Sequence, residues 1–289
     1  MQFCHTSRVR LTRVPDLTLA LATAAAYPQL DPDSALLPPA FGALGVAVEP
    51  RIWTDDDVDW AAYDAVVVRS VWDYFDRPAE FDAWVARASD QQPRFLNPPD
   101  VVRWNADKAY LGELADRGVP VVDTVYVAEG ETIEVPFAAG VAKPSVSGGS
   151  QGLRTVRGGE TLAAEADLLV QPLLESIRTE GELSLLFAAG ELSHAVRKTP
   201  AAGDIRSQPE FGSVVVAERA PEEAQEVART VLQAVGTELA YARVDLVRAD
   251  DGTLRLIELE AIEPQLYLAW DESAPARFAS AIADAARSA

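Results

Sequence analysis

The spacing of apolar segments changes part-way along this chain, and that change restricts the folds open to it. In the first third, short apolar segments alternate with stretches of helical periodicity. Strands joined through helices lie parallel in a sheet, so this part predicts a small βαβ lobe. The expected strands are 17–23, 46–52 and 65–68, and the expected helices are 33–44 and 78–89.

From Gly140 on, turns rather than helices separate most of the strands. Strands joined by short turns pair antiparallel, so this part predicts a different kind of sheet. Before Gly140, we expect a helix at 106–117 and a strand at 121–127. After it, we expect strands at 141–146, 153–156, 168–171, 183–187, 192–197, 242–247 and 254–260, and helices at 221–235 and 273–288. Asn105 is the expected N-cap of the helix 106–117, and Gly118 ends it. The expected fold class combines α/β and α+β architecture.

Composition excludes several classes of function. The chain has 289 residues, with 25 Lys and Arg against 45 Asp and Glu, so its net charge of −20 argues against a broad nucleic-acid surface. The apolar run at 17–27 is shorter than the roughly 20 residues of a membrane helix, so we expect a cytoplasmic protein without a membrane span. One Cys and two His allow neither an internal disulfide nor a cysteine- or histidine-rich metal site. Any metal ion must bind carboxylates.

A lysine followed by a loop of serine and glycine lies in the expected strand 141–146. The segment 142–152 reads Ala-Lys-Pro-Ser-Val-Ser-Gly-Gly-Ser-Gln-Gly. Backbone N–H groups of such a loop can turn toward one anion, and Lys143 adds a positive charge for phosphate. Gly and Ser are also the ordinary residues of a hairpin turn, and the residues alone leave that alternative open.

Acidic side chains gather on adjacent strands near the C-terminus. Asp245 interrupts an apolar strand, and Glu258 and Glu260, two residues apart, project from one face of the next strand. Glu263 extends the group into the following loop. Such a group is costly without a cation, and Mg²⁺ held by one or two carboxylates plus substrate phosphates is the usual remedy. The alternative is that Glu258 and Glu260 lie on a solvated face.

Cations stand at the end of another strand and in the loop after it. Arg197 ends the strand 192–197 and Lys198 follows it directly. Arg206 comes later, in Gly203-Asp204-Ile205-Arg206-Ser207. In so acidic a chain, a phosphate site must be built from local cations. Charges at strand ends often only solubilise the protein, and this alternative also stays open.

The apolar strand 65–68 runs into Arg69-Ser70-Val71-Trp72-Asp73-Tyr74, where polar groups crowd together. In open α/β sheets, ligands bind beyond the carboxyl ends of the strands. We therefore expect Arg69 to bind the carboxylate or head group of a small substrate, beside Ser70 and between walls formed by Trp72 and Tyr74. The alternative for the two aromatic residues is that they only pack the interface between lobes.

Taken in order, these pieces resemble the ATP-grasp ligases over 17–288. The motifs are Asn105-Ala106-Asp107-Lys108, Lys143-Pro144 with its loop, Val170-Gln171-Pro172-Leu173-Leu174, Gly203-Asp204-Ile205-Arg206-Ser207, Asp245 and Glu258-Leu259-Glu260. The family mostly has Glu-x-Asn at the last motif, so Glu260 is a departure that leaves the number of metal ions open. Further motifs are similar to the branch that contains the O-ureido-serine cyclo-ligase of cycloserine biosynthesis. They are Arg69-Ser70-Val71-Trp72-Asp73-Tyr74, Ser193-His194-Ala195-Val196-Arg197-Lys198 and Glu258-Leu259-Glu260-Ala261-Ile262-Glu263-Pro264.

The resemblance implies an enzyme that clamps ATP and Mg²⁺ between two lobes. The implied divisions are a disordered leader at 1–16, a substrate lobe at 17–98, a middle ATP-binding lobe at 99–172 and a C-terminal lobe at 173–289. The implied reaction is a carboxylate–amine ligation or a ring closure through an acyl phosphate of a small amino-acid-like substrate, with release of ADP and phosphate. Intermolecular ligation and a non-catalytic nucleotide-binding protein are the alternatives, and a homodimer is compatible with the sequence.

The resemblance also assigns roles to single residues. The expected nucleotide-binding residues are Lys108, Lys143, Ser147, Gly148, Gly149, Ser150, Gln171, Pro172, Leu173, Glu175 and Glu182. The expected metal ligands are Asp245, Glu258 and Glu260, and the expected catalytic residues are Arg197, Lys198 and Arg206. Arg69, Ser70, Trp72 and Tyr74 are expected to bind the substrate.

Overall fold

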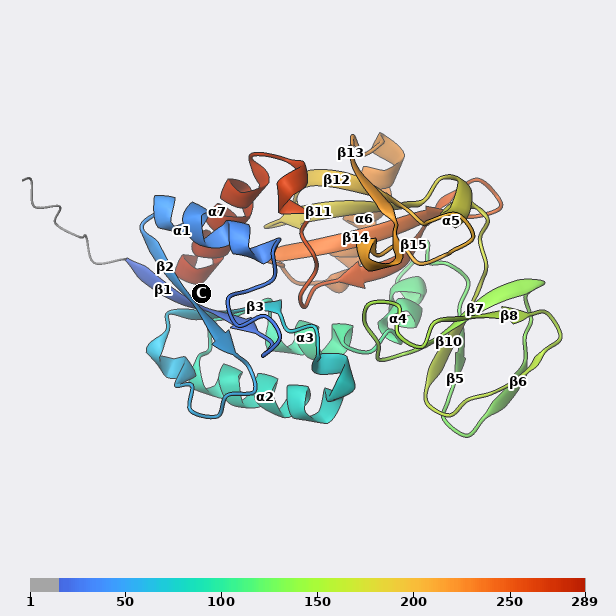
Figure 1. Cartoon of the computed structure of the whole chain (residues 1–289), viewed down its shortest axis with the longest axis horizontal. Helices are drawn as coiled ribbons and strands as arrows, with labels where there is room; N and C mark the ends of the chain where they lie inside the picture. The colour runs from blue at the N-terminus through green and yellow to red at the C-terminus, as the bar shows by residue number, and fades with distance from the viewer. Residues whose placement is uncertain (1–15, 289) are drawn as a thin grey trace, which may run out of the picture.

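The computed structural model describes residues 16–288, so the leader expected at 1–16 lies, apart from Asp16, outside the described residues. Figure 1 shows a parallel sheet at one end of the molecule, a small antiparallel lobe at the other, and a larger antiparallel sheet next to both. Within residues 16–288, none of the helices is both long and apolar enough to cross a membrane.

The N-terminal sheet is parallel, as its alternating strands and helices predict. Its strand order is β2-β1-β3-β4. The strands are β1 (Leu17–Thr23), β2 (Val46–Ile52), β3 (Ala65–Ser70) and β4 (Phe95–Leu96). Leu19 of the central strand β1 lies opposite Val48 on one side and Ala65 on the other. The prediction of a βαβ lobe is confirmed.

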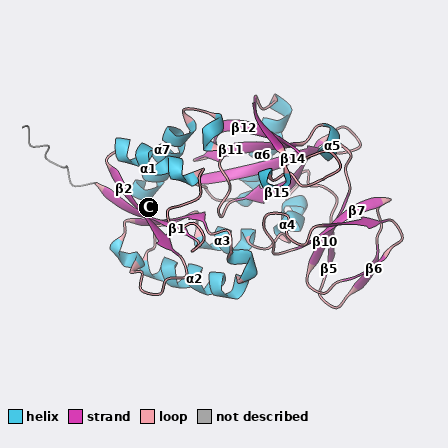
Figure 2. Cartoon of the chain, in the orientation of Figure 1, coloured by secondary structure: helices cyan, strands magenta, loops and turns pink. Residues whose placement is uncertain are grey.

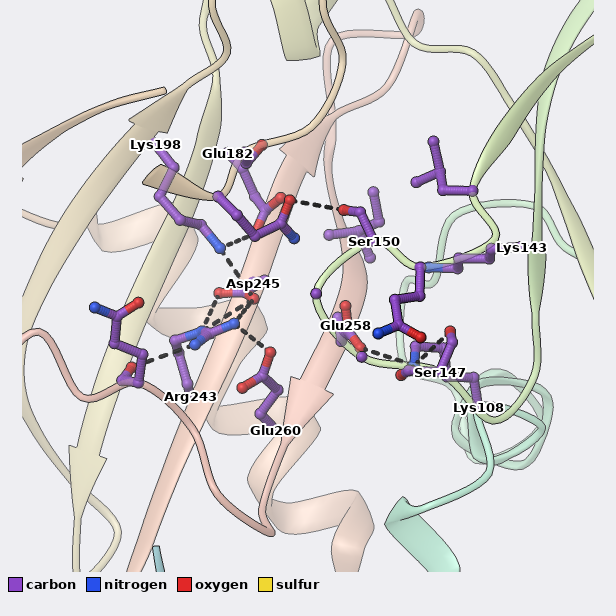
Figure 3. A pocket seen from close by; sticks show the side chains of 18 of the residues that line it. Lys108, Lys143, Ser147, Ser150, Glu182, Lys198, Arg243, Asp245, Glu258 and Glu260 are labelled. Carbon is purple, nitrogen blue, oxygen red and sulfur yellow. Dashed lines mark hydrogen bonds and ion pairs between the residues drawn. The ribbon is translucent and has the colours of Figure 1, made fainter. Parts of the chain in front are cut away.

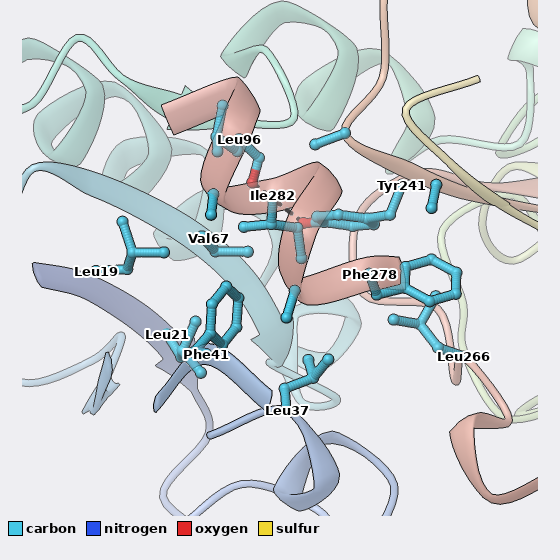
Figure 4. Packing of buried hydrophobic residues seen from close by; sticks show 14 of the residues in the cluster. Leu19, Leu21, Leu37, Phe41, Val67, Leu96, Tyr241, Leu266, Phe278 and Ile282 are labelled. Carbon is cyan, nitrogen blue, oxygen red and sulfur yellow. Dashed lines mark hydrogen bonds between the residues drawn. The ribbon is translucent and has the colours of Figure 1, made fainter. Parts of the chain in front are cut away.

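The two faces of this sheet have separate cores because side chains alternate along each strand. Leu19 and Leu21 pack against α1 (Leu37–Ala43) and α7 (Ala274–Ser288), and Figure 4 shows this cluster. Ala20 and Ala22 face the aromatic cluster under α2 (Pro78–Gln91). The C-terminal helix α7 therefore completes the core of the N-terminal lobe.

The small lobe is an antiparallel sheet with strand order β5-β10-β7-β8. Its strands are β5 (Val125–Val127), β7 (Ala139–Pro144), β8 (Arg154–Arg157) and β10 (Leu168–Pro172), with the ladder β6 (Thr132–Glu134) and β9 (Thr161–Ala163) beside it. Lys143 of β7 lies opposite Leu169 of β10. Small apolar side chains such as Ala142, Val156 and Val170 form its core.

The larger sheet is antiparallel throughout, with strand order β13-β12-β11-β14-β15. Its strands are β11 (Glu182–Ala188), β12 (Glu191–Thr199), β13 (Val214–Glu218), β14 (Tyr241–Arg248) and β15 (Leu254–Glu260). The helices α4 (Tyr110–Asp116) and α6 (Glu222–Val235) share a core with it, and the short helix α5 (Ser176–Thr179) leads into it (Figure 2). The predicted antiparallel strands and the predicted fold class are confirmed.

The structure corrects the expectation of one helix at 106–117. The chain forms α3 (Pro99–Asn105), a short turn and then α4, so Asn105 ends a helix instead of capping one. Its buried amide donates to the Leu259 carbonyl at 2.9 Å and accepts from the Ala261 N–H at 2.7 Å. A side chain suited to capping is equally suited to bonding main-chain groups elsewhere in the fold.

The expected strand 121–127 is also shorter than predicted. Only Val125–Val127 form a strand, while Val121 makes an isolated parallel bridge with Leu256 of the larger sheet. The segment therefore crosses from the larger sheet to the small lobe. The helix α4 likewise shares a core with the larger sheet, and α7 shares one with the parallel sheet. Contacts therefore cross the lobe divisions expected after residues 98 and 172.

Candidate functional site

A cavity of about 520 Å³ lies where the N-terminal lobe, the small lobe and the larger sheet meet. Lys143 and the glycine loop line it from the small lobe, Glu258 and Glu260 from the larger sheet, and Trp72 from the N-terminal lobe. Figure 3 shows Lys108 and Lys143 on one side and Arg243 with Asp245 on the other. The site combines residues that are far apart in the sequence.

The lysine side of the cavity is suited to an anion. Lys108 donates to the Ser147 carbonyl and forms an ion pair with Glu258 at 3.3 Å. The ammonium group of Lys143 has no hydrogen bond or ion pair within residues 16–288, and burial together with the charge of Lys108 lowers its pKa. Two ammonium groups that repel each other favour an anion between them, and phosphate is such an anion.

The glycine loop, defined here as Ser147–Gln151, touches both other parts of the molecule. Ser150 donates from its hydroxyl to Oε1 of Gln208, in the loop that follows β12, at 2.7 Å. Gly148 faces the ring of Phe75 so closely that an added Cβ would lie 2.2 Å from Cε1. The loop therefore closes the cavity in this structure, with Gly148 at the tightest point.

Carboxylates line the cavity from β15. Glu258 and Glu260 flank the buried Leu259 and keep 30% and 28% of their side chains exposed. Lys108 and Lys143 lower the pKa of Glu258 against the opposing effect of burial. Burial, with the charges of Glu258 and Asp245, raises the pKa of Glu260 to about 7 although Arg243 opposes this. A bound cation would relieve this repulsion.

Asp245 is already saturated with donors. Arg243 donates from Nε at 3.0 Å and from Nη2 at 2.9 Å, Lys198 lies at 3.3 Å, and Ser184 donates its hydroxyl. Burial acts in the opposite direction, but Arg243 and Lys198 still hold the pKa of Asp245 well below its usual range.

Two of the carboxylates in the cavity fit a site for Mg²⁺. In the described chain, 16–288, no group of three acidic, Cys or His side chains is arranged to hold a metal ion. Mg²⁺ commonly binds one or two carboxylates together with phosphate oxygens. Glu258 and Glu260 fit that pattern because both line the cavity, whereas Asp245 does not fit in this arrangement.

The expected catalytic cations separate because side chains alternate along β12. Lys198 lines the cavity, where it pairs with Glu182 and Asp245, and these charges raise its pKa against the effect of burial. Arg197 points away and pairs with Glu218 of β13, with 2.6 Å between Nη2 and Oε1. The structure therefore corrects the role expected for Arg197, which does not line the cavity.

Arg206 lies at the edge of the cavity rather than inside it. Its Nη2 pairs with Asp204 at 2.7 Å, and its guanidinium lies 3.7 Å from the ring centroid of Phe211. The neighbouring residues Ile205 and Ser207 line the cavity, but Arg206 does not. The expectation that Arg206 reaches the reacting groups is therefore not met in this arrangement.

An apolar slot lies beside the lysines, and its walls are Val122, Val141, Leu174, Ile177 and Ile257. The expected residues Gln171 and Pro172 line the cavity here, as do Lys108, Lys143, Ser147, Gly148, Gly149, Ser150 and Glu182 elsewhere. Leu173 and Glu175 do not line it, and the exposed Glu175, directly before α5, pairs with Arg178 instead. Leu174 takes the place expected for Leu173.

The residues expected to bind substrate divide into two pairs. Trp72 and Tyr74 line the cavity. Arg69 is only 1% exposed, donates to the Pro264 carbonyl at 2.7 Å and lies over the ring of Tyr241. Ser70 donates its hydroxyl to Asp31 at 2.6 Å. The expectation for Arg69 and Ser70 is corrected: they hold the cavity wall from behind and do not reach its interior.

Several lining residues escaped the sequence analysis. Arg243 stands two residues before Asp245 and so shares its face of β14, a signal that the sequence did contain. The lining residues Tyr27, Phe75, Gln265 and Tyr267 carry no local signal, because only the tertiary fold brings them to the cavity.

Comparison with known proteins identifies the family. Residues 19–97 match the model of the N-terminal domain of D-cycloserine synthetase DcsG. The cycloserine biosynthesis protein DcsG of Streptomyces lavendulae is 34% identical over 299 residues, which covers 92% of this chain and 98% of that protein. The crystal structure of D-cycloserine synthetase DcsG superposes with a TM-score of 0.82 and 31% identity over 93% of this chain and 99% of that chain.

The chain belongs to the ATP-grasp ligases, in the cycloserine synthetase branch. The D-alanine–D-alanine ligase from Bacillus anthracis, solved with ATP, shares the fold at a TM-score of 0.68 and 14% identity, over 94% of this chain and 97% of that chain. The ATP-grasp ligase PsnB, solved with a variant of its minimal precursor, Mg and ADP, shares the fold at a TM-score of 0.64 and 15% identity, over 93% of this chain and 98% of that chain. As an ATP-grasp ligase, the chain is an ATP-dependent enzyme of bond formation, as predicted.

Proposed function

We propose that this ATP-grasp ligase activates the carboxylate of a small amino-acid-like substrate as an acyl phosphate and then joins it to a nitrogen nucleophile. The observation that carries the proposal is one cavity lined by Lys143, Glu258 and Glu260, in which the Lys143 ammonium has no hydrogen bond or ion pair within residues 16–288. A wall of Trp72 and Tyr74 completes the same cavity. Groups for phosphate, for a metal ion and for an organic substrate thus meet in one place.

Lys108, Lys143 and the glycine loop would hold the phosphates of ATP, and the apolar slot would hold its adenine. Glu258 and Glu260 would hold Mg²⁺, which when bound neutralises phosphate charge during the transfer. Because the chain carries a net charge of −20, long-range attraction of a nucleotide is absent and these local cations must supply it.

The proposed reaction has two steps. A carboxylate oxygen of the substrate attacks the γ-phosphorus, the bond to the bridging oxygen breaks, and ADP leaves. The nitrogen nucleophile then attacks the acyl carbon, inorganic phosphate leaves, and the nitrogen loses its proton. Arg243, which pairs with Glu260 in the cavity wall, would stabilise negative charge on the acyl oxygen. The glycine loop, closed against Phe75, would keep water from the acyl phosphate.

The similarity to D-cycloserine synthetase favours ring closure, in which the carboxylate and the nitrogen belong to the same molecule. The test measures ADP release with a panel of small amino acids and O-substituted serines, each with and without a second amine. Ring closure predicts ADP release with one substrate alone, and intermolecular ligation predicts release only with both. ATP binding without ADP release under any condition would contradict the proposed function and support a nucleotide-binding protein.

A further inference from the structure

The segment that follows β15, residues 263–267, is held in place through its main chain. Its carbonyl oxygens accept hydrogen bonds from Trp72 at 3.1 Å, Arg69 at 2.7 Å, Arg243 at 3.2 Å and His194 at 3.1 Å, at positions 263, 264, 265 and 267. Asp33 accepts the Leu266 N–H at 2.9 Å and the Leu268 N–H at 2.7 Å. Donors and acceptors from the N-terminal lobe and the larger sheet therefore fix this segment.

The fixed main chain determines where the side chains of the segment point. Pro264 and Leu266 are buried, whereas Glu263 and Gln265, which alternate with them, line the cavity. The binding groups of a site are most effective when their supports hold them before the ligand arrives. Glu263 has such support, because its own carbonyl is bound by the Trp72 indole N–H.

The carboxylate of Glu263 faces the cavity, and within residues 16–288 it has no ion pair and no hydrogen bond from another residue; only its own backbone N–H donates to it. The other acids of this wall are paired: Glu258 with Lys108, Glu260 with Arg243, and Glu182 with Lys198. Burial and the charge of Glu260 raise the pKa of Glu263 to about 8, so a cation supplied from outside the protein would stabilise its charged form.

The walls around Glu263 indicate which kind of cation. Tyr27 and Trp72 meet edge to face at 5.3 Å between ring centroids, and both line the cavity together with Tyr74. Aromatic faces attract organic ammonium groups but supply no oxygen ligands of the kind Mg²⁺ requires. A carboxylate next to aromatic walls therefore suits an organic ammonium group better than a metal ion.

We propose that Glu263 is a specificity-determining residue that binds the α-ammonium group of the substrate. This inference rests on the proposed function, which supplies an amino-acid-like substrate. In an amino acid, the ammonium and carboxylate groups share one carbon, so their partners must lie close together. The charge of Glu260 acts on Glu263, and Glu260 pairs with Arg243, so the two proposed partners lie in the same part of the cavity.

The experiment compares probes that differ only in the ammonium group. Serine is paired with 3-hydroxypropionate, and alanine with propionate, and binding is measured by calorimetry with Mg²⁺ and a non-hydrolysable ATP analogue present. The wild-type protein should bind the amino acid about ten- to hundred-fold more tightly than its matched acid, the range of a charge-assisted hydrogen bond. Glu263→Gln should reduce that ratio to near one by weakening only the amino acid.

Two further variants control for charge and folding. Glu272→Gln removes the same charge at an exposed position outside the cavity and should leave the preference for the amino acid unchanged. Glu263→Asp keeps the charge and should retain part of the preference. The affinity for the ATP analogue should be the same in all variants, which excludes general damage to the site.

The outcomes separate this inference from the proposed function. If the wild-type protein does not prefer amino acids over matched acids, or if Glu263→Gln weakens both probes equally, the role of Glu263 is refuted. If the preference depends on Glu263 but no amino acid stimulates ADP release, the proposed function fails while the ammonium site stands. ADP release that is insensitive to Glu263→Gln, at subsaturating substrate, would refute the ammonium site and leave the ligase.

Discussion

Gly148→Ala provides a direct test of whether closure of the glycine loop matters for turnover. The glycine has an ordinary negative φ region available to alanine, so backbone strain does not enter. The added Cβ would lie 2.2 Å from Cε1 and 2.5 Å from Cδ1 of Phe75. Carbon atoms in contact normally stay about 3.5 to 4.0 Å apart, so the loop or the ring must move by more than about 1 Å.

The magnitude follows from the cost of overpacking. An added methyl group in a tight contact costs about 1 to 3 kcal/mol, which lowers the ratio of closed to open loop by about fivefold to 150-fold. We therefore expect kcat/KM for ATP to fall within that range in a steady-state assay of ADP release. The melting temperature should change little, because the loop can move away from Phe75 in the ligand-free protein.

Two companion variants identify the cause. Phe75→Ala in the Gly148→Ala background removes the clashing ring and should recover most of the lost kcat/KM. Gly42→Ala is the matched control, because it lies in α1 and its Cβ would meet nothing within 4 Å. Wild-type activity in Gly148→Ala, or no recovery in the double variant, would refute the reasoning that closure against Phe75 is needed.

The remaining predictions concern charges. Lys143→Ala should weaken Mg-ATP binding in calorimetry by about tenfold or more, the value of a charge-assisted hydrogen bond. Asp251→Ala, in the exposed turn before β15, should not weaken it. Equal losses of affinity in the two variants would contradict the phosphate-binding role of Lys143. Arg197→Ala should leave kcat within about twofold of wild type. Lys198→Ala should lower the melting temperature strongly, because loss of one partner of a buried ion pair lowers the free energy of unfolding by about 3 to 5 kcal/mol. Burial lowers the pKa of His194 below its ordinary value of 6.5. As the pH falls, the imidazole is therefore protonated at a higher pH in the unfolded chain than in the folded protein. Stability should then decrease below about pH 6.5 by up to about 1.4 kcal/mol per pH unit, and urea denaturation of His194→Gln should lack this part of the pH dependence.

Local patterns predicted most of the elements because hydrophobic periodicity reflects one element at a time. The strand 254–260 has the predicted bounds, and α6 lies within one residue of its predicted ends. Glu258 and Glu260 share a face for the same reason, since alternation along a strand is a local property. The order of these pieces along the chain was enough to indicate the ATP-grasp ligases.

Where each charged side chain ends up was decided by partners far along the chain. Arg69 was expected to bind substrate, yet it donates to the carbonyl of Pro264, 195 residues away in sequence. Asp245 was expected to bind metal, yet Arg243 and Lys198 already occupy it. A buried charge is costly without partners, and the sequence does not list which partners the fold brings near.

The sequence by itself determined most of the strands and helices, the change from parallel to antiparallel pairing and the family. The tertiary structure alone decided which of the expected residues reach the cavity and which further residues join them. Phe75 and Tyr27 carry no local pattern that marks them, and they reach the cavity because separate lobes meet there. Periodicity acts over one or two turns or strands, whereas a cavity between lobes depends on contacts between residues that are hundreds of positions apart.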